Sequence, residues 1–250
     1  MSAPSRQKKW RDRYVVQSDD VDPHGNLSLV AQLCLLQETA WRHAESLGFG
    51  YSDISKSRLL WVVTRFLLEM SKTPKWGESL EIETWARWPD GIYAYRDFVI
   101  YNEGQEEIGR ASSSWLILDE TTRRPQKIEM LGPVTDVSLR ESNGLEASKI
   151  ELDQSFTPLH EYQVRWSDLD MNRHVNNTKY AQWIMDSLPA EWHAHHRVRR
   201  YLVNFLAEMH LGDTVKIAEK TDDQRDKTRV FKGQRPKDSK TVFAVELGFE

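Results

Sequence analysis

The chain has 250 residues, and its 34 lysines and arginines nearly balance 38 aspartates and glutamates, for a formal net charge of −4. This balance excludes a global basic field of the kind that binds nucleic acid or an anionic membrane surface, so an anionic partner must meet a local basic patch. The single cysteine, Cys34, excludes an internal disulfide and a cysteine-based metal cluster, and it fits a reducing compartment.

The N-terminal segment, residues 1–13, is basic and polar and lacks the apolar stretch of a secretory signal. No run in the chain approaches the ~18 consecutive apolar residues of a membrane span. We therefore expect a cytoplasmic protein without membrane insertion.

Each half of the chain predicts a strand, then a helix, then several strands, and four strands follow the helix in the first half. Residues 27–47 are apolar nearly all round, which is typical of a helix buried on most faces, and Cys34 is expected to be a core packing residue in it. Gly48 and Gly50 follow and end the helix. Strand-like runs, separated by turn sequences, then occupy residues 61–70, 79–88, 92–101 and 107–118.

The second half repeats this plan after a stretch without clear periodicity, residues 125–160, which we interpret as a linker. A helix is predicted from about 176 to 188, where Pro189 stops it, and strands are predicted near residues 201–209, 213–220, 229–234 and 241–249. A strongly apolar helix before four antiparallel strands predicts an α+β repeat, with the helix wrapped by a curved sheet. We assign residues 1–124 to an N-terminal repeat and 161–250 to a C-terminal repeat.

Two sequence matches indicate that the halves arose by duplication. Residues 14–22 align with residues 162–170, 148 positions later, so that Asp22 coincides with Asp170. Residues 66–70 align with residues 205–209, 139 positions later. This second match places Glu208 on Glu69 and predicts that Glu208 lies on a strand.

The segment 165–180 is the richest in reactive groups. It places two carboxylates, three amides and an imidazole just before a helix, whose N-terminal N–H groups stabilise negative charge. Asp170 and Asn176 also fit plain capping roles, and His174 also fits a loop histidine. At the positions of Asn172, Arg173 and His174 in the second copy, the first copy has His24, Gly25 and Asn26. This difference favours chemistry in the second copy alone.

Several motifs resemble those of the fatty acyl-ACP thioesterases of plastids and bacteria. In the first half they are LLQETA at 35–40, WVVTR at 61–65, PKWGE at 74–78 and TTRR at 121–124; in the second they are SDLDMNRHVNN at 167–177 with Lys179, Tyr180 and Trp183. The resemblance covers about residues 14–215. It implies two tandem hotdog repeats, each a long central helix wrapped by a curved antiparallel sheet. It also implies a hydrolase of fatty acid biosynthesis whose first repeat shapes the acyl pocket while the second is catalytic.

The motif match places Asp170, Asn172 and His174 on the family's catalytic positions, with Glu208 on an acidic position that follows about thirty residues later. The family pattern has cysteine after this acid, whereas this chain has Met209, and a thioether cannot form an acyl-enzyme. We therefore expect water to attack the thioester directly.

The roles expected from the resemblance follow from this. Glu208 or His174 would polarise the water, and Asp170 would orient the helix N-terminus or share the role of base. Asn172 would hold the water or the carbonyl. The oxyanion would be received by backbone N–H groups near Val175 and Asn176.

The implied partner is an acyl carrier protein with a phosphopantetheine-linked acyl chain. Such carriers are acidic, so docking needs exposed cations. Candidates close to the loop in sequence are Arg173, Lys179, Arg197, Arg199 and Arg200. No cofactor and no metal are expected, because the histidines at 193, 195 and 196 have no evident further ligands.

Other interpretations stay open at this point. The same fold serves acyl-CoA thioesterases, hotdog hydratases or dehydratases, and acyl-binding proteins without catalysis. Sequence also leaves open the acyl chain length, its saturation and whether two chains form a homodimer.

Overall fold

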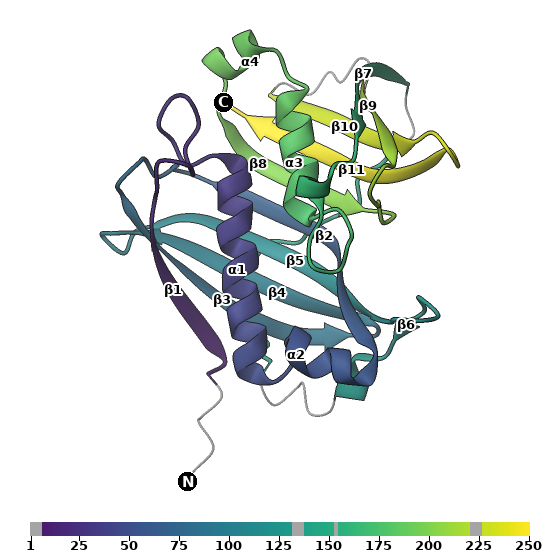
Figure 1. Ribbon diagram of the computed structural model, residues 1–250. Helices are drawn as coiled ribbons and strands as arrows, with labels where there is room; N and C mark the ends of the chain where they lie inside the picture. Colours follow the sequence, from purple (N-terminus) through teal and green to yellow (C-terminus); the bar gives the residue numbers. More distant parts are fainter. Residues whose placement is uncertain (1–6, 132–137, 153–154, 221–226) are drawn as a thin grey trace. The chain divides into compact units, whose positions relative to one another are not determined.

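The computed structural model describes residues 7–131, 138–152, 155–220 and 227–250. Parts of the predicted linker, 132–137 and 153–154, lie outside the described residues. The chain divides into two compact units, residues 1–147 and 148–250. Each unit is an antiparallel sheet with a helix against one face (Figure 1), so the predicted α+β architecture is confirmed.

The sheet of the first unit has the strand order β1-β3-β4-β5-β2, and every neighbouring pair is antiparallel. Its strands are β1 (Lys9–Val15), β2 (Leu59–Met70), β3 (Ser79–Asp90), β4 (Tyr93–Asn102), β5 (Glu107–Asp119) and the short β6 (Pro125–Gln126), which pairs with β5. The four strands after the helix were predicted to within a few residues.

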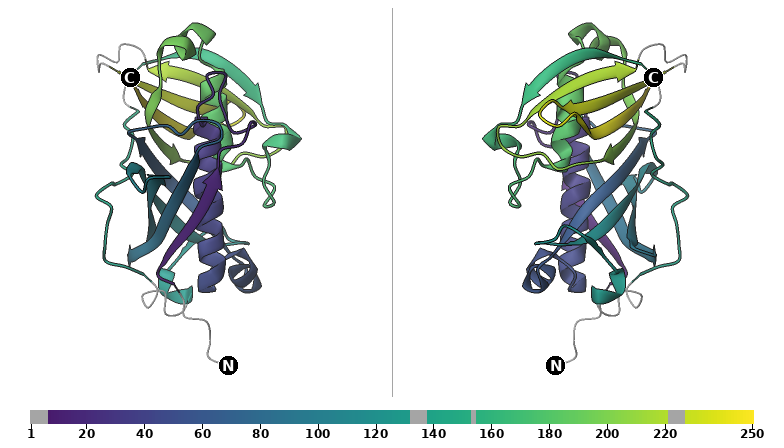
Figure 2. Two further views of the ribbon diagram at one scale, coloured as in Figure 1. Left: turned by 90° about the vertical axis from the view of Figure 1, so that its left-hand side faces the viewer. Right: turned by 90° about the vertical axis from the view of Figure 1, so that its right-hand side faces the viewer.

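Helix α1 (Leu29–Leu47) lies along this sheet (Figure 2). The side chain of Ser28 caps its start by accepting the N–H of Ala31 at 3.2 Å. Gly48 ends it with φ 78°, a left-handed conformation that glycine adopts without steric cost. The predicted helix is therefore confirmed in place and length.

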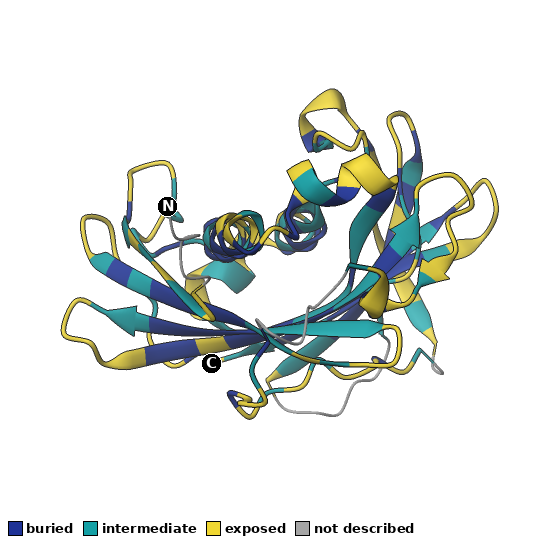
Figure 3. Ribbon diagram, turned by 90° about the horizontal axis from the view of Figure 1, so that it is seen from below, coloured by how far each residue is buried: buried dark blue, intermediate teal, exposed yellow. Residues whose placement is uncertain are grey.

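Only one side of α1 is buried, which corrects the expectation that it is buried on most faces. Cys34 is exposed rather than a core packing residue. Glu38 and Trp41 are exposed as well, and the spacing of three or four residues places all three on one stripe of the helix. Figure 3 shows α1 with buried and exposed sides. The buried residues of α1 are Leu29, Ala31, Gln32, Leu33, Leu36, Thr39, Ala40, His43 and Leu47.

Two short helices follow α1 that the sequence did not predict, α2 (Tyr51–Ile54) and η1 (Ser55–Ser57). They close one end of the core with a third short helix, η2 (Ile128–Leu131). The apolar cluster there consists of Leu47, Phe49, Ile54, Leu59, Ile117 and Ile128.

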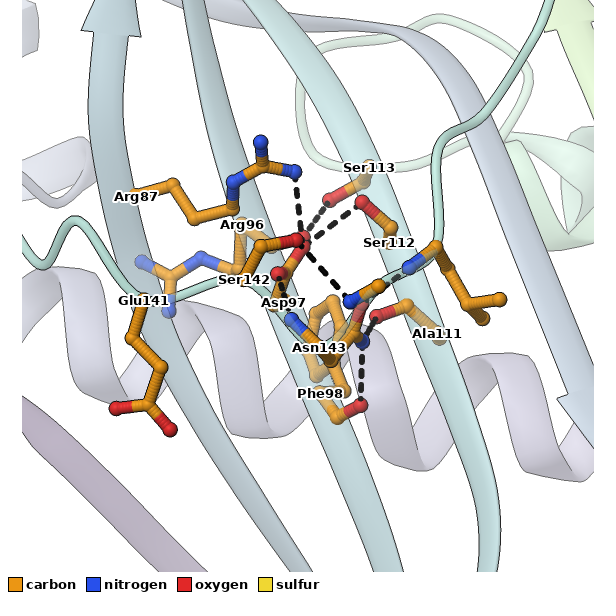
Figure 4. A network of polar contacts seen from close by, with 12 residues as sticks. Arg87, Arg96, Asp97, Phe98, Ala111, Ser112, Ser113, Glu141, Ser142 and Asn143 are labelled. Carbon is orange, nitrogen blue, oxygen red and sulfur yellow. Dashed lines mark hydrogen bonds and ion pairs between the residues drawn. The ribbon is translucent and has the colours of Figure 1, made fainter.

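Part of the predicted linker is bonded firmly to the sheet of the first unit (Figure 4). The buried carboxylate of Asp97 accepts the hydroxyl of Ser112 at 2.8 Å and the N–H of Asn143 at 2.9 Å. The Asn143 side chain donates to the carbonyls of Phe98 and Ala111. Burial raises the pKa of Asp97 although these bonds oppose the shift. Lack of periodicity in this segment therefore does not mean lack of fixed structure.

The second unit has the strand order β8-β11-β10-β9-β7, again antiparallel throughout. Its strands are β7 (Phe156–Gln163), β8 (Val198–Phe205), β9 (Thr214–Lys220), β10 (Thr228–Arg235) and β11 (Lys240–Phe249). Its helices are η4 (Trp166–Asp168), α3 (Asn177–Asp186) and α4 (Ala190–His195). Strand β8 ends at Phe205, so the predicted strand 201–209 is too long at its C-terminal end.

Aromatic side chains hold α3 against its sheet. The ring of Tyr180 makes edge contacts with Phe205 of β8 and Phe243 of β11, with centroids 5.5 and 5.0 Å apart. Trp183 contacts Tyr162 of β7 at 4.8 Å. These contacts fix where the N-terminus of α3 lies in its unit. Among the described helices, none combines the length and the apolar character needed to cross a bilayer.

Candidate active site

The loop that enters α3 has the same backbone hydrogen bonds as the loop that enters α1. In the second unit, the N–H of Asp170 donates to the carbonyl of His174 at 2.8 Å, and the N–H of Arg173 donates to the carbonyl of Asp170 at 3.0 Å. In the first unit, the residues 148 positions earlier make the same two bonds at 2.8 and 2.9 Å. The predicted shared scaffold is therefore present. We call these segments the first loop (residues 20–28) and the second loop (residues 168–176).

Asp170 holds the second loop together. Its Oδ1 atom accepts the N–H groups of Asn172 at 2.8 Å and His174 at 3.4 Å. Asp22 does the same in the first loop, at 2.8 and 3.0 Å. Because both copies use this carboxylate in the same way, its position is explained by loop geometry alone.

The turn inside each loop requires a left-handed residue. Gly25 has φ 77° in the first loop and Arg173 has φ 63° in the second. Glycine adopts this conformation freely, whereas an L side chain pays a conformational cost of about 1 kcal/mol or more. The second loop thus carries a mildly strained arginine beside the candidate catalytic residues.

Each loop is bonded to a second segment of its own unit. The N–H of Val175 donates to the carbonyl of Met209 at 3.0 Å, and the N–H of Leu27 donates to the carbonyl of Pro74 at 2.8 Å. The bonds on either side keep the same register, in which residues 71–78 correspond to residues 206–213 at an offset of 135. The predicted offset of 139 is therefore wrong, and Glu208 corresponds to Thr73 instead of Glu69. The chance similarity of residues 66–70 to residues 205–209 hid the true difference between the copies. The segment between the loop and the end of the following strand is shorter in the second copy by more than the match implied.

Glu208 and His210 flank Met209 in the segment after β8. Met209 is fully buried, whereas Glu208 is half-buried and His210 exposed, and each of these two has a side-chain N or O atom within 4.8 Å of such an atom of the other. The backbone is held at both ends: Arg235 donates to the Glu208 carbonyl at 2.7 Å, and the N–H of His210 donates to the carboxylate of Asp213 at 3.1 Å. Glu208 thus lies beyond the end of β8, not on the strand as predicted.

The two segments bring His174 and Glu208 together. His174 Nε2 lies 3.7 Å from Glu208 Oε2, and their side chains are 19% and 33% exposed, so both groups are partly shielded and yet accessible to solvent. The ring of His210 packs edge-on against that of His174, with centroids 4.9 Å apart. His210 is the member of this group that the sequence did not reveal, because nothing in the loop motif points to it. The one sequence feature that could have pointed to His210 is its position two residues after Glu208.

Comparison with known proteins places this geometry in a family. Residues 7–130 match the family model described as "Acyl-ACP thioesterase N-terminal domain", and residues 151–244 match "Acyl-ACP thioesterase C-terminal domain". The chain belongs to the acyl-ACP thioesterase family. The resemblance found in the sequence motifs is thereby confirmed.

Curated relatives of this acyl-ACP thioesterase family member come from plants. The chain is 30% identical to oleoyl-acyl carrier protein thioesterase 1, chloroplastic, of Arabidopsis thaliana, over 82% of this chain and 62% of the relative. It is 30% identical to dodecanoyl-[acyl-carrier-protein] hydrolase, chloroplastic, of Cinnamomum camphora, over 80% of this chain and 56% of the relative. The chain thus spans about three fifths of the length of these relatives.

Solved structures agree on the fold. An acyl-ACP thioesterase from Bacteroides thetaiotaomicron matches with a TM-score of 0.88 and 24% identity, covering 97% of this chain and 98% of its own. The 12:0-ACP thioesterase from Umbellularia californica matches with a TM-score of 0.82 and 22% identity, covering 100% and 99%. The fold is therefore the tandem hotdog that the resemblance implied.

The backbone groups predicted to receive an oxyanion are already paired. The N–H of Val175 donates to Met209, and the N–H of Asn176 donates to the carbonyl of Asp168 at 2.8 Å. That prediction is corrected: these bonds keep the second loop in place. The side chain of Asn176 caps α3 by accepting the N–H of Thr178 at 3.0 Å. Within the described chain, the N–H of Asn177 at the first turn of α3 has no hydrogen-bond acceptor.

The remaining predicted site residues differ in their exposure and in their hydrogen-bond partners. Asn172 is exposed at the tip of the second loop and makes no side-chain hydrogen bond to another described residue. Arg173 is also exposed, and Lys179 on α3 donates to Gln182 at 3.0 Å. The other three cations precede or begin β8, whose opposite end leads to Glu208. Arg197 bonds to backbone carbonyls of α4 and its end, Arg199 pairs with Glu250, and Arg200 pairs with Glu246.

The described part of the second unit contains no cysteine. The position after Glu208 holds Met209, and Cys34 belongs to α1 of the first unit. The histidines of α4 bond to nearby backbone carbonyls: His193 to Met185 at 3.0 Å and His195 to Glu191 at 2.9 Å.

Proposed function

We propose that this chain hydrolyses fatty acyl-ACP thioesters to free fatty acid and holo-ACP, by direct attack of water and without a cysteine nucleophile. The observation that carries the proposal is the contact of His174 Nε2 with Glu208 Oε2 at 3.7 Å in a member of this family. The first repeat has neither residue at the corresponding positions. Its proposed role is to shape the acyl pocket.

In the proposed reaction, the His174 and Glu208 pair accepts a proton from water as the water oxygen bonds to the thioester carbon. The tetrahedral oxyanion then collapses, the carbon–sulfur bond breaks, and the departing thiolate takes up a proton from the pair. General-base assistance of this kind contributes about 10²- to 10⁴-fold. A strong acid is not needed for departure because an ordinary thiol has a pKa of about 8.5.

The oxyanion is proposed to meet the N-terminus of α3. The N–H of Asn177 lies in the first turn of α3 without an acceptor among the described residues, and the helix dipole adds partial positive charge there. The side-chain amide of Asn172 is proposed to hold the water or the thioester carbonyl. Removal of one such donor costs about 3 to 4 kcal/mol in comparable sites.

Asp170 acts in this scheme as a positioning residue. Its Oδ1 atom already accepts two N–H groups of the second loop, which fixes the backbone of Asn172 and His174. It therefore supports the reactive groups, while the role of base falls to the His174 and Glu208 pair.

The proposed partner is an acyl carrier protein, and Arg173 and Lys179 are the cations best placed to meet its acidic surface. Arg173 lies in the second loop and is exposed, and Lys179 follows this loop in the first turn of α3. Arg199 and Arg200 are paired with carboxylates of their own sheet, so they are weaker candidates. An acyl-CoA thioesterase remains the second candidate function, because the bond that is broken is the same.

A panel of acyl-ACPs and matched acyl-CoAs tests substrate and reaction together, with free fatty acid as the measured product. We expect faster release from acyl-ACP, and faster release from acyl-CoA would assign the second function. Iodoacetamide provides the test of mechanism. It should modify exposed Cys34 without slowing hydrolysis, whereas inactivation that a Cys34→Ser variant escapes would contradict attack by water.

A further inference from the structure

We infer that His174, Glu208 and His210 form a site for a divalent transition metal, such as Zn²⁺, and that occupation of this site inhibits the enzyme. One potential ligand atom from each side chain lies within 4.8 Å of the other two. Among the described residues, this is the one group of three metal-ligating side chains that meets such a condition. The inhibitory part rests on the proposed function, whereas the binding part does not.

The ligand set matches the chemistry of zinc. Two imidazoles and one carboxylate are a recognised protein ligand set for this ion, with a further position left for water or a thiolate. In tetrahedral coordination with metal–ligand distances of about 2.0 to 2.2 Å, two ligand atoms lie about 3.3 to 3.6 Å apart. His174 Nε2 and Glu208 Oε2 are already 3.7 Å apart. Small side-chain rotations would complete the site.

The backbone around these side chains is fixed in a way that favours such a site. Glu208 and His210 hold potential ligand atoms within 4.8 Å of each other, and the residue between them, Met209, is fully buried. Arg235 and Asp213 hold this segment at its two ends, and the Met209 carbonyl bonds it to the second loop next to His174. Binding therefore requires side-chain movement only, with little loss of backbone entropy.

His210 is exposed, so a metal ion from solvent can reach its ring. Its ring is exposed, whereas the His174 and Glu208 side chains are partly buried. The metal would draw on both members of the proposed catalytic pair, so that neither could accept a proton from water. The result is reversible inhibition that depends on a residue outside the reaction itself.

Cobalt titration tests binding independently of activity. Purified full-length chain is titrated with Co²⁺, and the ligand-field absorption of a low-coordinate site is followed. We expect one saturable ion per chain, with at least about tenfold weaker binding in His210→Gln because two ligands replace three. His195→Gln, which changes an exposed histidine of α4, is the matched control and should bind as wild type. Equal binding by wild type and His210→Gln would overturn the site.

Zinc inhibition tests the consequence. Fatty acid release is measured directly, because Zn²⁺ binds liberated thiols and disturbs thiol-based assays. We expect wild type and His195→Gln to be inhibited reversibly, with recovery on EDTA, whereas His210→Gln, measured against its own zinc-free rate, resists inhibition. Cobalt binding without zinc inhibition would overturn the inhibitory role. Absence of hydrolysis on every acyl substrate would instead count against the proposed function, while the cobalt titration would still decide the site.

Discussion

The first and second loops share their backbone hydrogen bonds but differ in the side chains that could take part in catalysis. Both use an aspartate at the same position to accept two backbone N–H groups, both turn through a left-handed residue, and both bond to the carbonyl of a second segment. The second loop alone adds an imidazole that meets a carboxylate. The comparison separates residues that maintain the loop backbone, which we call the frame, from residues that serve catalysis. A feature present in both loops is explained by the frame.

The largest expected effect comes from removing the imidazole. His174→Ala should lower kcat for acyl-ACP hydrolysis by about 10²- to 10⁴-fold, because the proposed proton acceptor is lost. The matched change in the first loop is Asn26→Ala, which should leave kcat within about twofold, since it removes no proposed catalytic group. Steady-state kinetics with far-UV circular dichroism as a folding control measure both. A similar loss in both variants would show that the loops act through the frame alone.

The second largest effect is expected from removing the aspartate of each loop, which should distinguish an effect on stability from an effect on kcat. Asp170→Ala and Asp22→Ala each remove the acceptor of two backbone N–H groups, at a cost of about 1 to 2 kcal/mol after allowance for partial exposure. We expect similar falls in the free energy of unfolding, measured by urea denaturation. Only Asp170→Ala should also lose about tenfold or more in kcat, because it displaces His174. An unchanged kcat would mean that His174 does not need this support.

A third difference between the units concerns pH. Burial, with the nearby Arg96 guanidinium, lowers the pKa of His43 in α1 to about 3, and α3 has no histidine. Below pH 6.5, about the pKa of an unfolded histidine, His43 binds a proton in the unfolded chain but stays neutral in the folded chain. The free energy of unfolding therefore falls as the pH decreases from there toward 3. The slope approaches about 1.4 kcal/mol per pH unit. His43→Gln should flatten the pH dependence of the urea midpoint, and an unchanged profile would contradict this account.

The smallest expected effect tests the left-handed turn. Gly25→Ala should destabilise the chain by about 1 kcal/mol, because the conformation at φ 77° disfavours a side chain. A Cβ atom there would meet nothing within 4 Å, so no steric clash adds to the cost. Arg173→Gly should be neutral or stabilising by up to about 1 kcal/mol. Thermal unfolding followed by circular dichroism measures both, and a gain from Gly25→Ala would show that the two turns differ.

Much of the frame could be predicted from sequence because it depends on local patterns. The apolar period gave both long helices, alternation and turn residues gave eight strands, and the aligned aspartates indicated the shared loop. The expected position of Cys34 was wrong because apolar residues on nearly all sides of a helix do not reveal which face meets the sheet. Only the packing of α1 decides that, and it leaves Cys34 exposed.

The site was harder to predict where it depends on pairing between distant segments. His174 and Glu208 were identified through family motifs, but the contact of His210 with His174 arises only when the segment after β8 meets the second loop. The same meeting pairs the N–H of Val175 with the carbonyl of Met209, so that this N–H is already used. Sequence spacing alone cannot show which N–H groups are already used.

The bond between Val175 and Met209 has a consequence for the substitutions that position 209 tolerates. The holding group at position 209 is a backbone carbonyl, which every amino acid possesses, so the local architecture does not dictate which side chain stands there. Substitution is limited by the volume of the enclosed space around that side chain. A side chain that fits this enclosed space can therefore replace Met209 without displacing the neighbouring Glu208.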